Sequence, residues 1–122
     1  MRFSIPSCSF SRFADSAMVI RHCPCNFIPA LFTIADMSDI VGLIAPRPVV
    51  IVNGEEDDLF PIQPTREAFR EVERIYEAAG AKGRCHHVIG DGGHRFYADE
   101  AWTVMMPEIE RLGKSLNESE NR

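Results

Sequence analysis

An aspartate and a histidine each follow a segment that the sequence predicts to be a β-strand. Asp57 lies in the acidic loop GEEDDLFP, directly after the apolar run 49–52, and His94 ends the loop GDGGH, directly after residues 84–89. Functional side chains gather at the carboxyl ends of parallel strands, so we expect these two to be neighbours if the strands are adjacent. A carboxylate on one ring nitrogen fixes the tautomer of an imidazole and stabilises its cation, as a general base in acyl transfer requires.

The same two loops also have interpretations that involve no chemistry. An acidic loop after a strand is commonly solvated or caps the next helix, and a glycine-rich turn can hold a histidine without using it. Asp58 is a second candidate for the carboxylate, because it directly follows Asp57. The glycines beside His94 allow its loop to approach a neighbouring segment closely. The residues alone therefore leave a catalytic pair and a pair of ordinary loops both open.

The elements around these loops predict an α/β fold. The β-branched run 49–52 shows no polar alternation, which is typical of a strand buried on both faces of a parallel sheet. Residues 64–79 carry one apolar stripe opposite a charged face and are followed by Gly80, which predicts an amphipathic helix with a glycine stop. A final helix is predicted over 98–112, bent or restarted at Pro107.

The N-terminal part is less regular. Residues 1–10 are β-prone and predict a short strand, and Asp36 predicts the cap of a short helix. The alternation of strands and helices implies βαβ units, with about three parallel strands and flanking helices. We expect one domain over 1–114, followed by a polar, disordered tail at 115–122.

Composition excludes several classes of protein. Asp and Glu number 18 against 13 Lys and Arg, a net charge of −5, which argues against a nucleic-acid-binding surface. No apolar run approaches the roughly 20 residues that cross a bilayer. A chain of this size with its own apolar segments does not need a disulfide scaffold, so we expect its four cysteines to be free thiols and the protein to be cytoplasmic. No cofactor is expected.

Four stretches resemble one branch of the α/β-hydrolases, the dienelactone-hydrolase and acetyl-xylan-esterase-like branch. They are HCPCNFIP, DMSDIVGLIAPRP, GEEDDLFPI and GDGGHRFYADEAW, and the resemblance covers about residues 8–114. It implies the C-terminal part of such a domain, in which the triad runs Ser, Asp, His along the chain. Matched residue by residue, it places the triad acid on Asp57 rather than Asp58 and the triad base on His94. Residues 95–97 would start the final helix and shape the pocket wall.

The sequence departs from this family at the nucleophile. The elbow Gly-x-Ser-x-Gly does not occur in the 122 residues. We therefore expect a C-terminal fragment of a serine-type hydrolase of small carboxylic esters that is inactive by itself. Ser9 and Cys23 are the nucleophiles to suspect if activity is found.

Two other hypotheses remain. The chain could be a non-catalytic interaction module, or a subunit that completes a hydrolase with another chain, because an exposed first strand invites pairing, including pairing into a homo-oligomer. A zinc site is disfavoured, because Cys-Pro-Cys is tighter than the usual ligand spacing and occurs only once. The residues weighed for zinc are His22, Cys23, Cys25, Cys85, His86 and His87; we expect no metal, and His86 and His87 to alternate across a strand.

Overall fold

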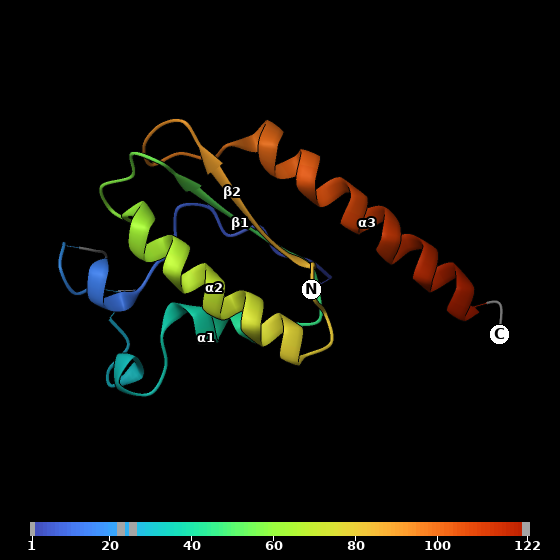
Figure 1. Cartoon of the computed structure of the whole chain (residues 1–122), viewed down its shortest axis with the longest axis horizontal. Helices are drawn as coiled ribbons and strands as arrows, with labels where there is room; N and C mark the ends of the chain where they lie inside the picture. The colour runs from blue at the N-terminus through green and yellow to red at the C-terminus, as the bar shows by residue number, and fades with distance from the viewer. Residues whose placement is uncertain (1, 22–23, 25–26, 121–122) are drawn as a thin grey trace.

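Two adjacent parallel strands form the centre of the molecule. In a computed structural model, which describes residues 2–21, 24 and 27–120 with side chains as far as Lys114, β1 (Val49–Gly54) pairs with β2 (Cys85–Gly90). The register runs from Val49 opposite Cys85 to Gly54 opposite Gly90. Both strands therefore end at the same edge, and the loops that carry Asp57 and His94 begin side by side (Figure 1).

Helices cover both faces of this sheet. Every residue of β1 is buried, as its uninterrupted apolar run predicts. Val49 and Ile51 pack into a cluster with Val72 and Tyr76 of α2 (Ile62–Ala78), and Val50 and Val52 pack with Ala101 and Met105 of α3 (Ala98–Glu120). Alternate residues of one strand thus anchor the two helices on opposite sides (Figure 1).

The other elements follow their local signals. α1 (Met37–Gly42) begins with a capping box, in which the Asp36 carboxylate accepts from the Met37 N–H at 2.7 Å and the Asp36 N–H donates to Asp39 at 2.8 Å. α2 ends before Gly80, whose positive φ of 68° is the conformation that glycine adopts readily after a helix. Short 3-10 helices span Phe13–Asp15 and Leu31–Thr33.

The third expected strand is present only in part. Within residues 1–10, two isolated parallel bridges join Ser4 to Val49 and Ser7 to Val52, on the side of β1 away from β2. Two regular strands therefore stand where we predicted about three. Pro6 lacks the N–H that a longer ladder would use, which limits regular pairing here.

The C-terminal helix differs from its prediction in two ways. It continues through Pro107, which is exposed, because Met105 and Glu108 are buried on either side of it and hold both halves on the sheet. It also extends to Glu120, so residues 115–120 continue the helix where we expected a disordered tail. These six residues contain neither Pro nor Gly, and nothing local ends the helix among them.

His86 and His87 lie on opposite faces of β2, as the alternation of a strand predicts. His86 Nε2 lies 3.3 Å from the buried carboxylate of Glu108 in α3. His87 Nε2 lies 3.2 Å from Asn53 Oδ1, and its ring packs against Phe69 of α2 with centroids 5.0 Å apart. Burial, followed by the nearby charge of Arg66, lowers the pKa of His87 to about 4.

This pKa predicts a loss of stability at acidic pH. In the unfolded chain a histidine titrates near 6.5, so between that pH and about 4 the unfolded state binds a proton at His87 that the folded state does not bind. The contribution of His87 is therefore complete above pH 6.5 and is lost as the pH falls toward 4, by roughly 2–3 kcal/mol in the free energy of unfolding. We expect His87→Gln, which keeps a donor toward Asn53, to flatten this part of the profile. Urea unfolding at pH 7 and pH 4.5 measures it, and equal losses in both proteins would contradict the assignment.

Candidate active site

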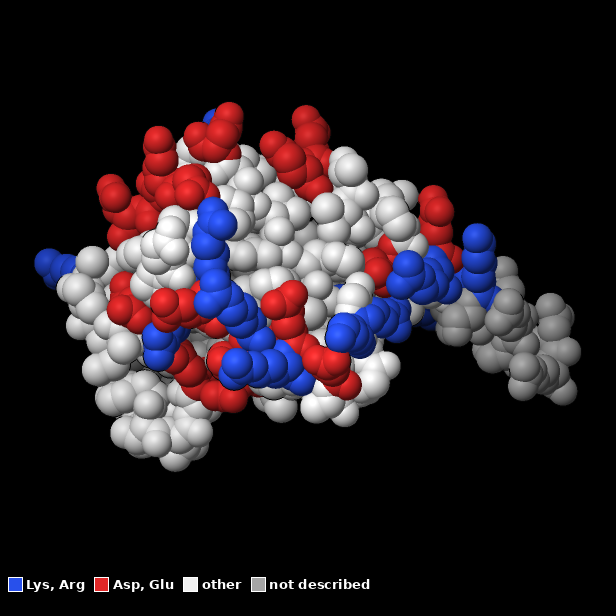
Figure 2. Space-filling model, viewed as in Figure 1, with Lys and Arg blue, Asp and Glu red and all other residues white. Residues whose placement is uncertain are grey.

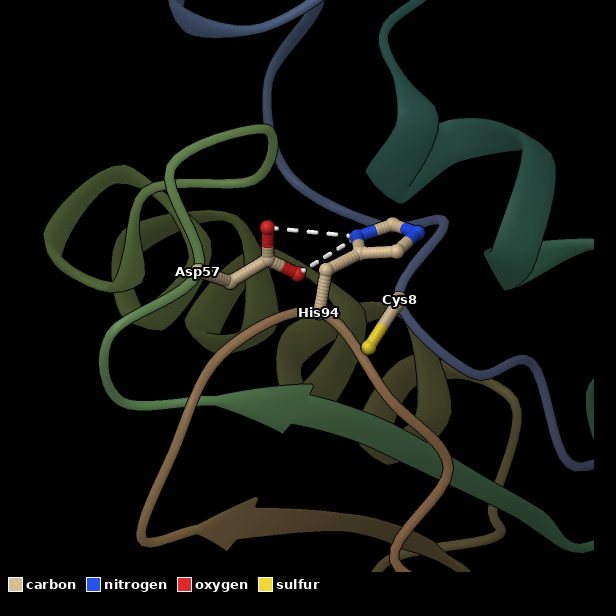
Figure 3. A group of neighbouring side chains, drawn as sticks. All are labelled: Cys8, Asp57 and His94. Carbon is tan, nitrogen blue, oxygen red and sulfur yellow. Dashed lines mark hydrogen bonds and ion pairs between the residues drawn. The ribbon is translucent and has the colours of Figure 1, made fainter.

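Asp57 and His94 are in contact at the carboxyl edge of the sheet. His94 Nδ1 lies 3.2 Å from Asp57 Oδ1 and 3.0 Å from Oδ2 (Figure 3). Asp57 comes from the loop after β1 and His94 from the loop after β2. The structure thus brings together the two residues that the sequence pointed to, which we call the dyad.

Asp57 is held by its own loop. Its side chain is fully buried, and its Oδ1 accepts hydrogen bonds from the N–H groups of Leu59 at 2.9 Å and Phe60 at 3.2 Å. These donors replace the water that a buried carboxylate loses and fix its orientation. Asp58, the next residue, is exposed, so its carboxylate is not buried in the loop as that of Asp57 is.

His94 is positioned by contacts between the two loops. The N–H groups of Glu55 and Glu56 donate to the carbonyls of Gly90 and Gly92 at 2.8 and 3.0 Å. On the other side, the Tyr97 hydroxyl donates to the carbonyl of Gly93 at 2.9 Å. The Phe60 ring is also stacked on the imidazole, with centroids 5.9 Å apart and an interplanar angle of 20°.

This arrangement fixes what the imidazole can do. A carboxylate is an acceptor, so Nδ1 carries the proton and Nε2 is left as the basic nitrogen. Figure 3 shows that the second ring nitrogen of His94 points away from Asp57. The His94 side chain is 46% exposed, so its free nitrogen can reach a reacting group brought to this edge of the sheet.

Residues 95–97 precede the final helix rather than start it, because α3 begins at Ala98. Tyr97 is buried and supports the loop of His94, whereas Phe96 is 48% exposed. The Arg95 guanidinium lies 4.7 Å from the centre of the Tyr97 ring and 3.2 Å from Asp91. Of the two nucleophiles to suspect, Ser9 is exposed and Cys23 lies outside the described residues.

The residues weighed for zinc do not form a ligand cluster where the structure describes them. His86 and His87 point to opposite faces of β2, and Cys85 is a buried free thiol. Burial raises the pKa of Cys85 to about 11, and the charge of Glu73 adds to the shift. His22, Cys23 and Cys25 lie outside the described residues.

Sequence reasoning missed Cys8. Its thiol, the Asp57 carboxylate and a His94 ring nitrogen all lie within 4.8 Å of one another (Figure 3). Cys8 is buried, it adopts a left-handed backbone conformation with φ 46°, and its Sγ donates to the carbonyl of Arg95 at 3.1 Å. Burial is the main cause that raises the pKa of this thiol, and Asp57 adds to it. Cys8 follows Ser7, the last bridged residue of the N-terminal segment, so it too lies at the carboxyl end of a strand-like segment. The sequence predicted a strand through residue 10, which placed that end after Cys8.

Acidic side chains surround this edge of the sheet. Glu55, Glu56 and Asp58 are exposed in the loop after β1, and Asp91 is exposed in the loop after β2. Figure 2 shows Asp and Glu gathered over the end of the molecule where these loops lie in the same view of Figure 1. Glu55 is paired with Arg66 at 2.7 Å and Asp91 with Arg95 at 3.2 Å, so Glu56, Asp58 and the buried Asp57 carry the excess negative charge, which favours cations over anionic ligands.

No protein-family model and no curated protein matches the chain. Among solved structures, it is similar to a carbohydrate esterase family 15 (CE15) glucuronoyl esterase from Caldicellulosiruptor kristjansonii. The TM-score is 0.64 at 19% identity, over 86% of this chain and 35% of that one. The chain thus spans about a third of the esterase it resembles. At this identity the likeness concerns the fold alone, and it agrees with a partial α/β-hydrolase-like fold.

None of the helices in the described part of the chain is long and apolar enough to cross a membrane.

Proposed function

We propose that this chain supplies the acid and base of a serine-type hydrolase of carboxylic esters, with His94 as general base and Asp57 as the residue that orients it. One observation carries the proposal. A buried carboxylate, fixed by two backbone donors, holds Nδ1 of a half-exposed histidine whose other nitrogen is free. This is the arrangement that activates a hydroxyl nucleophile in acyl transfer.

In this mechanism the serine comes from a segment with a Gly-x-Ser-x-Gly elbow, either joined to this chain or on a partner. His94 Nε2 takes the hydroxyl proton while the serine oxygen bonds to the ester carbonyl carbon. The imidazolium, stabilised by Asp57, then gives that proton to the departing alcohol as the ester C–O bond breaks. Water attacks the acyl-serine through the same base, releases the acid and restores the serine.

The substrate class follows from two resemblances. The sequence resembles the dienelactone-hydrolase and acetyl-xylan-esterase-like branch, and the structural neighbour is named as an esterase. Both support carboxylic esters as substrates, without choosing the acid or the alcohol. The acetyl-xylan-esterase-like branch is the narrower part of the proposal.

Turnover of p-nitrophenyl acetate tests the function. We expect residues 1–122 alone to give no more than the background rate, because general-base assistance without a nucleophile and an oxyanion hole contributes little. Adding the hydrolase portion that bears the elbow, encoded next to this chain or supplied separately, should restore turnover.

His94→Ala provides the control for this experiment. The variant should abolish the restored turnover and leave the background rate of the chain alone unchanged. Turnover by residues 1–122 that His94→Ala removes would reveal a nucleophile within them. A stable assembly without ester turnover would refute the proposed function.

A second candidate is a subunit that pairs through the N-terminal segment. The N–H groups of Ser4 and Cys8 donate to the carbonyls of Pro48, just before β1, and Val52 of β1, whereas in the described residues those of Ile5 and Ser7 have no backbone partner. Unpaired N–H groups on the outer side of an edge can donate to the carbonyls of a further strand, from a second copy or from the rest of a hydrolase. Light scattering that finds a monomer at every concentration would count against pairing between copies.

A further inference from the structure

We propose that Cys8, Asp57 and His94 form a binding site for a thiophilic divalent cation of the Zn²⁺ type, and that such an ion and the working dyad exclude each other. The first half of the proposal rests on geometry alone. The second half rests on the proposed function, because it concerns the same two residues.

The three side chains converge from three neighbouring segments. Cys8 follows the bridged N-terminal segment, Asp57 follows β1 and His94 follows β2 (Figure 3). Their ligand atoms lie within 4.8 Å of one another, and this is the one group of three or more potential metal ligands found in the described part of the chain. Residues 8, 57 and 94 are far apart in sequence, so the fold itself assembles the cluster.

The spacing is close to what a tetrahedral ion requires. Zinc binds sulfur at about 2.3 Å and nitrogen or oxygen at about 2.0–2.2 Å, which places any two of its ligand atoms roughly 3.3–3.8 Å apart. Atoms within 4.8 Å of one another need to close by at most roughly 1.0–1.5 Å. The His94 side chain is 46% exposed, so solvent reaches one member of the cluster and water can serve as a fourth ligand.

The donor types select the kind of ion. Thiolate and imidazole suit zinc, copper and related metals, whereas magnesium and calcium prefer sets of oxygen ligands. Asp57 is already fixed by Leu59 and Phe60, so one ligand is oriented before an ion arrives. The exposed carboxylates of Glu56 and Asp58 add negative charge that attracts cations, whereas Glu55 is paired with Arg66 at 2.7 Å.

An ion here would displace the dyad hydrogen bond. Nδ1 is the His94 nitrogen that faces Asp57, so an ion shared with Asp57 takes the place of the Nδ1 proton. Binding releases the thiol proton of Cys8 to solvent, whereas the proton of the neutral imidazole moves from Nδ1 to Nε2. The imidazole is then a metal ligand whose Nε2 carries the proton, so Nε2 has no lone pair with which to act as the general base.

Cobalt substitution tests the site in the purified chain, without any ester substrate. We expect one Co²⁺ per chain with a thiolate-to-cobalt charge-transfer band, and its displacement by Zn²⁺. Cys8→Ser should abolish the band, and both Cys8→Ser and His94→Gln should weaken Zn²⁺ binding at least 10- to 100-fold, the loss typical of removing even an outer partner of a metal ligand. In ¹H–¹⁵N spectra of the unsubstituted chain, Zn²⁺ should remove the Nδ1–H signal of His94, which needs no variant to fold.

Two control variants address the other thiols. Cys85→Ser changes a buried thiol outside the cluster and should leave the band and the affinity unchanged. A double variant with Cys23→Ser and Cys25→Ser should also keep them. A band that survives Cys8→Ser, or one that the double variant removes, would overturn the proposal.

The outcome is separable from that of the proposed function. If the chain binds zinc and no ester hydrolase can be assembled, the metal site stands and the hydrolase does not. If the assembled hydrolase is active but Zn²⁺ neither binds the chain nor inhibits turnover, the hydrolase stands and the metal site is refuted.

Discussion

Asp57→Asn is expected to lower ester turnover by the assembled hydrolase about 10⁴-fold, the loss known for the same change in serine-protease triads. The backbone donors of Leu59 and Phe60 both bond to Oδ1, and the amide oxygen of Asn can keep these bonds. The amide nitrogen then takes the place of Oδ2, the nearer of the two oxygens to His94 Nδ1, at 3.0 Å against 3.2 Å for Oδ1. Because that nitrogen is a donor, the imidazole moves its proton to Nε2 and loses its basic site.

Two measurements check this prediction. Turnover of p-nitrophenyl acetate gives the rate, and ¹H–¹⁵N imidazole spectra of the chain alone give the tautomer of His94, which should change from Nδ1–H to Nε2–H. Asp58→Asn is the matched control, because it makes the same change at the exposed neighbouring residue and should alter neither quantity. A larger loss of turnover in Asp58→Asn than in Asp57→Asn would show that Asp58, not Asp57, is the acid that orients His94.

The part of the fold that could be predicted is the part whose signals are local. The uninterrupted β-branched run of β1 indicated burial on both faces, and the apolar stripe of α2 indicated which residues meet the sheet. Once two parallel strands are adjacent, their carboxyl ends coincide, so Asp57 and His94 could be expected to meet. Register and side-chain geometry supplied the rest, including which of two consecutive aspartates is buried.

What could not be predicted depends on contacts between distant residues. Cys8 reaches the cluster through a left-handed conformation and a hydrogen bond to Arg95, 87 residues away. α3 continues through Pro107 because burial on both sides offsets the lost backbone hydrogen bond, and no local pattern reports that balance. The partial first strand also depends on distant contacts. Only its pairing with β1, at the two bridges of Ser4 and Ser7, shows that residues 1–10 form no continuous strand.

Gly54→Ala is expected to separate Asp57 from His94 without touching either residue. A Cβ atom at Gly54 would lie 2.3 Å from the carbonyl oxygens of both Gly92 and Gly93, which are backbone atoms of the His94 loop and cannot rotate away. The loop must therefore move, which disrupts the bond from the Glu56 N–H to Gly92 and shifts the imidazole. We expect a loss of roughly 1–3 kcal/mol in the free energy of unfolding, the cost typical of overpacking. Turnover of the assembled hydrolase should fall about 10²-fold, because an ångström of misplacement can cost that much.

Gly93→Ala is the matched control, since it adds the same methyl group one residue before His94. The nearest atom to its Cβ is the Glu56 carbonyl oxygen at 3.6 Å, an ordinary van der Waals distance. Urea unfolding measures the stability of both variants, and the ¹⁵N shifts of His94 report whether the contact with Asp57 persists. If Gly54→Ala keeps the wild-type shifts and stability, the two loops are not packed as closely as the dyad requires. If Gly93→Ala is equally damaging, glycine itself rather than the approach of the two loops is what this segment needs.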